Sequence, residues 1–491
     1  MKLSELVNVF PFLQVDVKED PIIQQIEMDH RQVKAGTLFI CINGYTVDGH
    51  DFAKNAVENG AVAVIAEKPL ALDVPVIIVK DSRRAMARLA NHFYHNPTKN
   101  LHLIGVTGTN GKTSTTLILE HIFQRNAKKT GVIGTMYAKV GQEKIETKNT
   151  TPESLLLQQT FQRMVHHQVD TALMEVSSHA LESGRTFGCD FNVAVFTNLT
   201  PDHLDYHKTM EDYLNAKGLL FAQLGSQYDG KFAVLNIDDP ASQKLMKMTS
   251  AEIITYSIHH NADISAKNIQ LSAKGTMFEL TIFNQTYQVD VQLIGKFNVY
   301  NILAAVAAAY VSGIPKEDIV KSLSELKGIA GRFETVKVNE KQDFTVVVDY
   351  AHTSDSLKNV LETVQELAQS SVKVVVGCGG NRDRSKRPVM AEVATKYAEQ
   401  AYFTSDNPRG EDPNKIIDDM IKGISYSNYM IEVDRKKAIY DAISSAQSGD
   451  IIVIAGKGHE TYQIFSDQTI HFDDREIAYE AIKERIRHVN I

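Results

Sequence analysis

The sequence predicts an α/β protein of three domains, and three observations support this fold class. The chain has 491 residues, enough for about three domains of roughly 150 residues each. Short apolar runs alternate with helical segments, a pattern typical of parallel sheets covered by helices. Two turn-rich segments interrupt the pattern, HNPTKN before residue 101 and GIAGRFE at residues 328–334, the second a candidate hinge. We therefore expect domains over residues 1–97, 98–331 and 332–491.

The composition is that of an ordinary globular protein. Hydrophobic residues make up 43% and charged residues 23%, and the net charge of -8 argues against a general electrostatic grip on nucleic acid. Cys41, Cys189 and Cys378 form no CxxC pair, so a reducing compartment is expected. The first residues lack the pattern of a signal peptide, and the longest apolar run, residues 302–311, is too short to span a bilayer. We expect a cytoplasmic monomer without membrane insertion.

The first domain is expected to be a small α/β unit. Its apolar runs, at residues 37–42, 61–66 and 74–79, alternate with helical stretches such as residues 81–94.

The central domain begins with an apolar strand, residues 103–106, that enters the segment GTNGKTST and then a helical run. Residues 253–294 indicate antiparallel strands with turns at Lys274-Gly275 and Asn284, and a helix is expected over residues 299–311. Further strands of this domain are expected at residues 171–176, 192–198 and 232–236.

The third domain repeats a strand-then-loop theme. Each apolar run ends in a polar loop that contains glycine or proline, and helical segments such as residues 356–369 lie between the runs. This pattern predicts a parallel, doubly wound, Rossmann-like sheet. The expected strands are residues 344–348, 372–376, 401–404 and 451–454.

Residues 105–113, GVTGTNGKT, predict a phosphate-binding loop. They fit the pattern G-x-x-x-x-G-K-[ST] with one extra residue, or its shorter core from Gly108. Lys112 would reach the outer phosphates of ATP, and the Thr113 hydroxyl would bind Mg²⁺. A plain glycine turn is the alternative, but the strand, loop, Lys-Thr pair and helix together favour ATP binding. The residues of this loop expected to bind ATP are Gly108, Thr109, Asn110, Gly111, Lys112, Thr113 and Ser114.

Two further strands of the central domain end in groups suited to a second Mg²⁺. Glu175 closes the strand in TALMEVSSHA, and His203 follows the strand in VAVFTNLTPDH. Open α/β sheets bind ligands at the carboxyl ends of their strands, so both side chains should approach the phosphate loop.

Lys217 lies on the apolar face of a predicted helix, four residues after Tyr213 and four before Phe221. A bare ammonium group facing inward is costly. Spacing alone favours a lysine whose head reaches back to water. The alternative is a carbamate formed with CO₂, which would be a carboxylate-like metal ligand.

TGTNGKTS resembles the phosphate loop of Mur ligases and folylpolyglutamate synthetases, and Y-x-x-A-K-x-x-L-F around Lys217 resembles the Mur ligase motif whose lysine is carbamylated. The resemblance implies a three-domain architecture: a UDP-substrate domain, a P-loop ATPase domain and a Rossmann-like amino-acid-binding domain. It favours N6-carboxylysine at position 217. It also implies the catalytic residues Lys112, Glu175, His203 and Lys217, and the metal ligands Thr113, Glu175, His203 and Lys217.

The resemblance extends to both sides of the second domain junction. Asn298 and Asn301 in GKFNVYN can offer amide pairs to an adenine edge, or can simply cap a helix. Arg332 matches an arginine that approaches the nucleotide phosphates. Asp349 matches an aspartate that binds the ribose, and His352 lies in the same motif, VVVDYAHT.

The substrate ends of the chain resemble the muramoyl-dipeptide branch of the family. His30 stands where those ligases usually carry a serine that contacts the uridine part, and Ser183 stands where a glutamine is common. The NTTP segment could also be a simple helix start before Pro152. The residues implied for binding the UDP-muramoyl dipeptide are His30, Asn149, Thr150, Thr151, Ser177, Ser183 and Arg185.

The loop DNPR resembles the family signature that selects the incoming amino acid. The arginine of this loop, Arg409, would grip the extra carboxylate of meso-diaminopimelate, and Glu460 suits its distal ammonium group. By itself the loop could be a helix-leading turn with a solvated arginine. The residues implied for binding diaminopimelate are Arg382, Asp406, Asn407, Pro408, Arg409, Gly456 and Glu460.

The implied activity is an ATP- and Mg²⁺-dependent ligase that acts on small-molecule substrates in peptidoglycan synthesis. ATP would phosphorylate the carboxylate of UDP-N-acetylmuramoyl-L-alanyl-D-glutamate, and meso-diaminopimelate would displace the phosphate. Three rivals remain: an L-lysine-adding ligase, a folylpolyglutamate synthetase-like ligase, and a non-catalytic UDP-sugar sensor.

Overall fold

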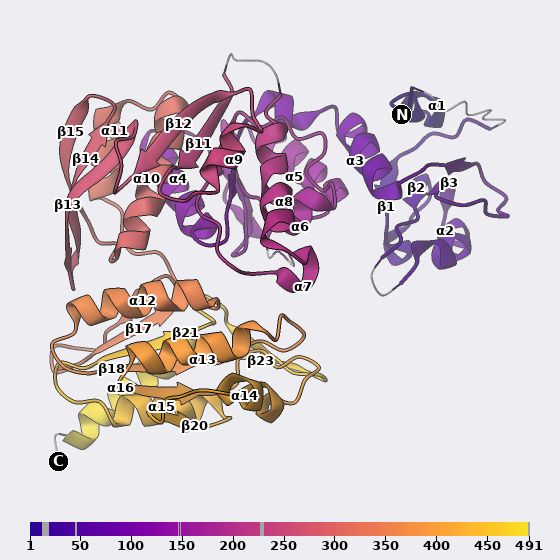
Figure 1. Ribbon diagram of the computed structural model, residues 1–491. Helices are drawn as coiled ribbons and strands as arrows, with labels where there is room; N and C mark the ends of the chain where they lie inside the picture. The colour runs from indigo at the N-terminus through magenta and orange to yellow at the C-terminus, as the bar shows by residue number, and fades with distance from the viewer. Residues whose placement is uncertain (12–18, 45–46, 146, 148, 226–229, 490–491) are drawn as a thin grey trace.

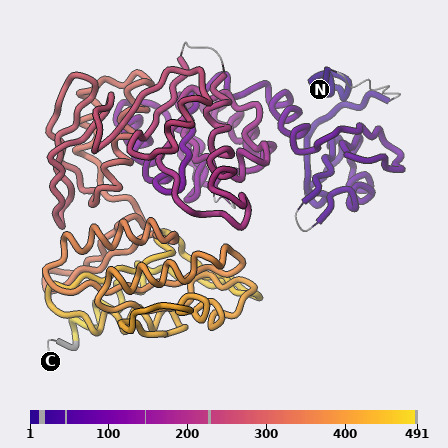
Figure 2. Tube along the Cα trace, viewed as in Figure 1, coloured from indigo at the N-terminus to yellow at the C-terminus, as the bar shows by residue number. Residues whose placement is uncertain are grey.

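The computed structural model describes residues 1–11, 19–44, 47–145, 147, 149–225 and 230–489. Three bodies follow one another along the chain (Figures 1 and 2). The N-terminal body (indigo) lies to one side of the central body, and the C-terminal body (orange to yellow) lies beneath the central one. The α/β fold class is confirmed.

The N-terminal body is a parallel sheet in the order β1-β2-β3-β4. Its longest helix begins where the Asp81 side chain accepts a hydrogen bond from the Arg84 N–H, and Met86, Leu89 and Ala90 of that helix are buried. The elements are α1 (Leu3–Val7), β1 (Gln25–Glu27), η1 (His30–Gln32), β2 (Thr37–Ile40), η2 (Gly49–Phe52), α2 (Ala53–Glu58), β3 (Ala61–Ala66), β4 (Val76–Ile78), α3 (Ser82–Phe93) and η3 (Pro97–Asn100).

The central body is a long mixed sheet in the order β15-β14-β13-β12-β11-β10-β5-β9-β6-β7-β8, whose inner strands are parallel. Its first elements are β5 (His102–Thr107), α4 (Lys112–Arg125), β6 (Thr130–Ile133), β7 (Ala138–Val140), β8 (Glu143–Ile145), α5 (Ser154–His166), β9 (Thr171–Glu175), α6 (Ser178–Glu182), β10 (Val193–Phe196), α7 (Leu204–His207) and α8 (Met210–Ala222). The remaining elements are β11 (Phe232–Asn236), α9 (Ser242–Met246), β12 (Glu252–Ser257), β13 (Ile264–Ser272), β14 (Gly275–Ile282), β15 (Gln285–Val291), α10 (Lys296–Val311) and α11 (Lys316–Ser324).

The prediction of antiparallel strands over residues 253–294 is wrong for its first strand. β12 pairs parallel to β11, because the connection through α9 brings the chain back to the same end of the sheet. β13 also pairs parallel to β12. β13, β14 and β15 form the predicted antiparallel part.

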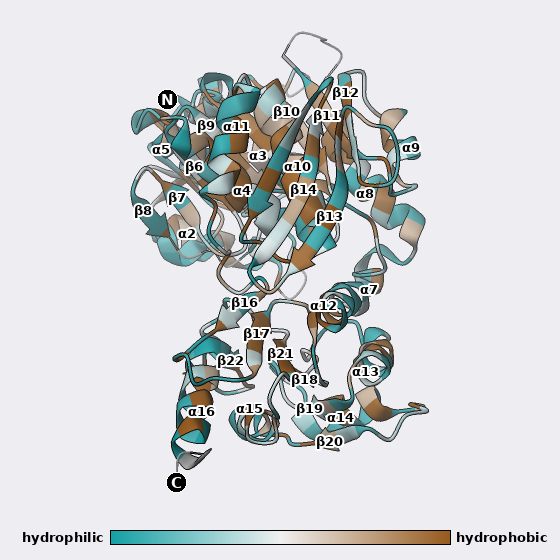
Figure 3. Cartoon of the chain, turned by 90° about the vertical axis from the view of Figure 1, so that its left-hand side faces the viewer, coloured by the Kyte–Doolittle hydropathy of each residue, from teal (hydrophilic) through white to brown (hydrophobic). Residues whose placement is uncertain are grey.

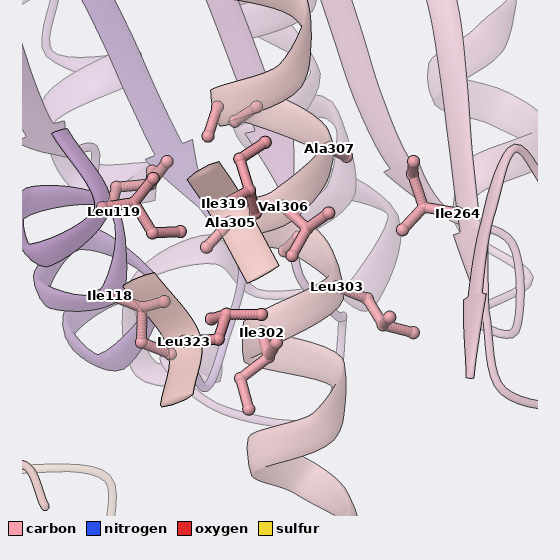
Figure 4. Packing of buried hydrophobic residues seen from close by; sticks show 14 of the residues in the cluster. Ile118, Leu119, Ile264, Ile302, Leu303, Ala305, Val306, Ala307, Ile319 and Leu323 are labelled. Carbon is pink, nitrogen blue, oxygen red and sulfur yellow. The ribbon is translucent and has the colours of Figure 1, made fainter. Parts of the chain in front are cut away.

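Helix α10 lies at the centre of the largest apolar cluster. It is buried on nearly all sides, and its alanines allow a close approach to α4. Figure 4 shows Ile302 and Val306 of α10 beside Ile118 and Leu119 of α4, with Ile319 and Leu323 of α11 packed against them. This packing holds the start of α4, and with it the phosphate loop, against the sheet.

The C-terminal body is a sheet in the order β16-β17-β21-β18-β19-β20, parallel except for β16. The predicted doubly wound sheet is confirmed. The elements are β16 (Glu334–Val336), β17 (Thr345–Asp349), α12 (Ser354–Leu367), β18 (Val372–Val376), α13 (Lys386–Tyr397), β19 (Gln400–Phe403), α14 (Pro413–Ile421), β20 (Tyr429–Ile431), α15 (Arg435–Ser444), β21 (Ile451–Ala455), β22 (Tyr462–Ile464), β23 (Thr469–His471) and α16 (Asp474–Val489).

The hydropathy of the chain follows these layers. Figure 3 shows apolar segments along the inner strands and along helix α10, and polar segments on the outward helices such as α16. In the part of the chain that the structure describes, no helix has both the length and the apolar character to cross a bilayer.

Candidate active site

A cleft of about 780 Å³ lies between the central and C-terminal bodies. Its central wall comes from the phosphate loop and from the carboxyl ends of β9, β10 and β11. Its other wall comes from loops that follow β17, β18, β19 and β21. The strands of both sheets therefore point their carboxyl ends at one another, as expected for ligand sites of open α/β sheets.

The phosphate loop joins β5 to α4 in a conformation that needs its glycines. Gly108 has a φ of 147° and Gly111 a φ of 87°. A Cβ atom would fall on the Thr197 hydroxyl at Gly108 and on the Asn301 side-chain oxygen at Gly111. The N-terminus of α4 is thereby brought against the cleft, with its free N–H groups available to a phosphate.

Lys112 and Thr113 face the cleft at the first turn of α4. The Lys112 Nζ donates to the carbonyl oxygens of Gly108 at 3.0 Å and Thr109 at 2.8 Å. Burial lowers the pKa of Lys112, and Glu175 and Asp202 oppose this shift. The loop thus folds around its own lysine, in the place where phosphate oxygens would compete for the ammonium group.

Glu175 lies at the end of β9, as predicted, and is bonded to the phosphate loop. Its carboxylate accepts hydrogen bonds from the Thr113 hydroxyl at 2.9 Å and from the Thr135 N–H at 2.9 Å. The Thr135 hydroxyl in turn lies 3.0 Å from the Thr150 hydroxyl. A hydroxyl and a carboxylate at this distance are the oxygen donors that Mg²⁺ prefers, so Thr113 and Glu175 fit a magnesium ion.

Lys217 of α8 is buried, with 1% of its surface exposed, so the interpretation that spacing alone favours, a head that reaches water, is wrong. Its Nζ donates to the Gly108 carbonyl at 2.7 Å and lies 4.3 Å from the centre of the Tyr213 ring. Desolvation lowers its pKa well below the ordinary value. Lys217 thus lies directly behind the phosphate loop and does not line the cleft itself.

His203 lines the cleft just before α7, in the left-handed backbone region with a φ of 56°. Its Nε2 lies 3.4 Å from Asp202 Oδ2. Among the described residues, no cluster of three or more His, Cys, Asp or Glu side chains is arranged to hold a metal ion. A second magnesium at His203 would therefore need a further ligand, such as a carbamate on Lys217.

Arg332 meets the phosphate loop from the C-terminal side, and Asp349 lines the same cleft. The Arg332 guanidinium donates to the Thr113 hydroxyl at 3.1 Å and lies 4.4 Å from the centre of the Tyr350 ring. Asp349 ends β17 and accepts hydrogen bonds from the backbone of Phe333 and Ala351, each at 2.7 Å. Burial raises the pKa of Asp349, and Arg332 opposes this shift.

Of the two asparagines of α10, one faces the core and the other faces the cleft. Asn301 lines the cleft, whereas Asn298 does not. The Asn298 amide donates to the Ile294 carbonyl at 2.9 Å and accepts from Asn301 at 3.2 Å. Neither asparagine caps the helix, because Gly295 occupies the N-cap position. Of the two, Asn301 is therefore the asparagine whose side chain reaches the cleft.

The residues predicted to bind the amino-acid substrate lie together at the far end of the cleft. The residues of this set that line the cleft are Arg382, Asp406, Asn407, Arg409, Gly456 and Glu460. The Arg409 guanidinium donates to the carbonyl oxygens of Gly380 at 3.1 Å and Asn407 at 3.3 Å. Arg409 has a φ of 52°, and its N–H donates to the Ile464 carbonyl at 3.0 Å. Pro408 is buried beside it.

The predicted sugar-nucleotide residues fall into two groups. Thr150 and Ser177 line the cleft, and the Thr151 hydroxyl donates to the Glu175 carbonyl at 2.8 Å. Arg185 donates to the Thr151 carbonyl at 3.0 Å and pairs with Glu153 at 2.9 Å. These residues form one patch around the end of β9.

The other predicted sugar-nucleotide residues do not line the cleft. The Ser183 hydroxyl donates to the His179 carbonyl at 2.7 Å at the end of α6. Asn149 is exposed. His30 lies in the N-terminal body, where its ring stacks on Phe52 at 4.5 Å. A substrate that reaches from His30 to the cleft must be long, which suits a nucleotide sugar with a peptide attached.

Sequence reasoning missed several polar residues of the cleft. Asp355 begins α12, and its carboxylate accepts a hydrogen bond from Asn110 of the phosphate loop at 2.9 Å. Lys386 of α13 lies 3.9 Å from Asp202 of the central body. Asp238 and Asp239 follow β11 and line the cleft. The position of Asp238 and Asp239 soon after a strand could have marked them as cleft residues. Asp355 and Lys386 lie at the starts of helices, and no sequence pattern marks them.

Family models match most of the chain. The model of the Mur ligase family catalytic domain matches residues 22–94, that of the Mur ligase middle domain residues 106–309, and that of the Mur ligase glutamate ligase domain residues 331–458. The facing strand ends and the phosphate loop are those of an ATP-dependent ligase, and the chain belongs to the Mur ligase family.

Three relatives within the family share one name. The chain is 63% identical to the UDP-N-acetylmuramoyl-L-alanyl-D-glutamate–2,6-diaminopimelate ligase of Halalkalibacterium halodurans over 99% of both chains. It is 56% identical to the ligase of the same name from Bacillus cereus, again over 99% of both chains. A solved structure of a ligase of that name is 34% identical, covers 98% of this chain and 99% of its own, and has a TM-score of 0.69.

A more distant structure shares the fold alone. The folylpolyglutamate synthase of Mycobacterium tuberculosis, solved with ADP and AMPPCP, is 16% identical and has a TM-score of 0.63. The match covers 76% of this chain and 92% of the synthase.

Proposed function

We propose that this chain adds meso-diaminopimelate to UDP-N-acetylmuramoyl-L-alanyl-D-glutamate, with ATP, in peptidoglycan synthesis. The observation that carries the proposal is the cleft itself, where a phosphate loop on one wall faces the DNPR loop and Glu460 on the other. Its relatives at 63% and 56% identity bear the name of this activity. We also propose that the enzyme is cytoplasmic and monomeric.

The first step transfers the terminal phosphoryl group of ATP to the carboxylate of the dipeptide. Lys112 leaves its loop carbonyls to bind the outer phosphates, and Arg332 approaches the same group from the opposite wall. Two cations on opposite sides neutralise the charge that the phosphoryl group spreads over its oxygens. The expected products are ADP and an acyl phosphate.

Magnesium would be held by Thr113 and Glu175, and it would neutralise phosphate charge there. We further propose that Lys217 becomes a carbamate that, with His203, completes a second metal site. Its burial directly behind the phosphate loop supports this proposal. The described contacts of the unmodified ammonium group are a carbonyl oxygen and an aromatic ring, and neither is a carboxylate. Thr150, Thr151, Ser177 and Arg185 would position the muramoyl dipeptide beside Glu175.

In the second step the amine of diaminopimelate attacks the acyl phosphate, and phosphate leaves. Positioning is the main requirement, and it comes from the C-terminal loops. Arg409 is placed for the distal carboxylate and Glu460 for the distal ammonium group, while Arg382, Asp406, Asn407 and Gly456 line the rest of this end. L-lysine lacks the distal carboxylate, so this arrangement favours diaminopimelate over lysine.

The decisive experiment measures ADP release by the purified protein with each substrate supplied in turn. We expect sustained release, over many turnovers, only when UDP-muramoyl dipeptide and meso-diaminopimelate are both present. Lys112→Ala should lose the activity, and Lys128→Ala, at an exposed lysine of the same body, should keep it. ADP release with a folate and glutamate would instead support the folylpolyglutamate rival. Binding of the UDP-sugar without any ADP release would support the non-catalytic sensor.

A further inference from the structure

Lys457 lies behind the amino-acid end of the cleft, and none of the steps above uses it. Its side chain is fully buried, and its Nζ lies 3.1 Å from Asn407 Oδ1 and 3.2 Å from Glu460 Oε2. Asn407 also donates to Glu460 Oε2 at 2.9 Å. These three side chains form a closed triangle that joins the loop after β19 to the loop after β21.

The triangle has one face on the cleft and one in the core. Asn407 and Glu460 line the cleft, whereas Lys457 does not. Lys457 therefore cannot touch the substrate without displacing them. A buried ammonium group is costly unless it is paired, and the carboxylate that pairs with it here is Glu460.

Several charged groups surround Glu460. Lys457 and Asp406 act on it from two different loops. Arg382 acts on it from the loop after β18, Arg435 from α15 and Tyr350 from just after β17. Desolvation raises the pKa of Glu460 and Asp406 raises it further, while the charge of Lys457 and the hydrogen bonds from Asn407 and Lys457 lower it. Lys457 is the nearest of the cations, in direct contact with the carboxylate.

We propose that Lys457 is a positioning and specificity-determining residue, which holds the Glu460 carboxylate charged and aimed at the distal ammonium group of the amino-acid substrate. The inference rests on the proposed function, because that function supplies the ammonium group. Selectivity for the distal ammonium group then depends on a cation, Lys457, that the substrate does not touch.

The Lys457 charge favours the charged form of Glu460, so its loss should change how substrate binding depends on pH. Removing the Lys457 charge should raise the pKa of Glu460, so the carboxylate becomes neutral at a higher pH than in the wild type. The protonated acid cannot pair with an ammonium group. As pH is lowered, the affinity of the variant for diaminopimelate should begin to fall at a higher pH than that of the wild type. The affinity of the variant should return at alkaline pH.

The test compares two acceptors that differ only in the distal amine, meso-diaminopimelate and L-2-aminopimelate. On the acid limb, Lys457→Met should raise the KM for diaminopimelate by up to about tenfold, the factor that one pKa unit represents. The KM for 2-aminopimelate should stay within about twofold, and the acid limb of kcat/KM for diaminopimelate should move up by about one pH unit. Lys457→Gln keeps a donor toward Asn407 without the charge, and it should give the same result if the methionine variant does not fold.

Lys373→Met is the matched control, because Lys373 is another buried lysine of the C-terminal body, at the other end of β18 beside Asp450. It should leave both the acceptor ratio and the acid limb unchanged. An equal change in KM for both acceptors in the Lys457 variants, or an acid limb that stays in place, would overturn the inference. A wild type that releases no ADP with diaminopimelate would instead refute the proposed function.

Discussion

At the scale of single residues, the selectivity for the amino acid depends on Arg409. Its guanidinium is anchored on two carbonyl oxygens, and its backbone is held in the left-handed region by Ile464. A non-glycine residue with this φ is strained, and such strain is typical of functional positions that their surroundings hold in place. An anchored arginine fork loses little freedom when it binds a carboxylate in two places.

We expect Arg409→Ala to raise the KM for diaminopimelate sharply and to leave ATP binding nearly unchanged. The loss of a charged pairing in a desolvated pocket typically costs about 2–5 kcal/mol. Steady-state kinetics with each substrate varied in turn would measure both effects. Arg384→Ala, at an exposed arginine paired with Asp419, is the control and should behave like the wild type. Equal turnover of L-lysine and diaminopimelate by the wild type would contradict the role of Arg409, although the ligase activity would stand.

A second residue, Lys217, tests the carbamate. Lys217→Ala should abolish ligation, because the variant loses the proposed carboxylate-like ligand behind the phosphate loop. A short carboxylic acid added to the variant should restore part of the activity by supplying the missing oxygens. The same acid should not accelerate the wild type. Full activity of the alanine variant without any additive would rule the carbamate out.

At the scale of elements, the phosphate loop depends on glycines, and two of the glycines in the chain form a matched pair. Gly111 has a φ of 87° and Gly313 a φ of 88°, yet a Cβ would strike Asn301 at the first and meet nothing within 4 Å at the second. Alanine at either position carries the same left-handed backbone penalty, about 1–2 kcal/mol. Only alanine at Gly111 also pushes against the cleft wall.

We therefore expect Gly111→Ala to weaken nucleotide binding at least tenfold, whereas Gly313→Ala should lower thermal stability only and keep the wild-type affinity. Calorimetric titration of a nucleotide together with thermal unfolding of both variants would separate the two effects. If Gly313→Ala weakened nucleotide binding as strongly as Gly111→Ala, the collision with Asn301 would not be the cause.

The β22–β23 hairpin is the element that supports the DNPR loop. The buried Gln463 amide donates to the Asp406 carbonyl at 2.7 Å and to the Ser405 hydroxyl at 2.9 Å, and the Ile464 N–H donates to Asn407 at 3.0 Å. Gln463→Leu should raise the KM for diaminopimelate several-fold, because it leaves two buried acceptors without a donor. Gln468→Leu makes the same change at an exposed position of the hairpin and should have no effect. Unchanged kinetics in Gln463→Leu would show that the hairpin is dispensable for this loop.

At the scale of the whole molecule, the cleft is closed by contacts between bodies. Asn110 bonds to Asp355, and Thr113 to Arg332. The segment predicted as a hinge belongs in part to the C-terminal body, since a Cβ at Gly331 would strike the backbone of His459. Arg332 therefore moves with that body, and the pivot must lie before Gly331. Gly328 has open space around it and suits the pivot.

We expect nucleotide and dipeptide together to shift the enzyme toward the closed arrangement, because their binding groups lie on both walls. Small-angle scattering should show a smaller radius of gyration under saturation. Asp355→Ala, which removes one closing contact, should require more ligand for the same decrease. A radius of gyration that does not change at saturation would count against the moving third body.

The sequence by itself determined the α/β class, the phosphate loop and the strand ends that carry Glu175, Asp349 and Asp406. These features are visible locally, because a strand, its following loop and the next helix are contiguous in the chain. The tertiary structure decided which of two equally suitable asparagines faces the cleft and that Lys217 points at the phosphate loop. It also paired Asp355 with Asn110 and placed Lys457 behind Glu460. The physical reason is that a side chain's partner and its share of water are set by packing between distant segments, which no local pattern records.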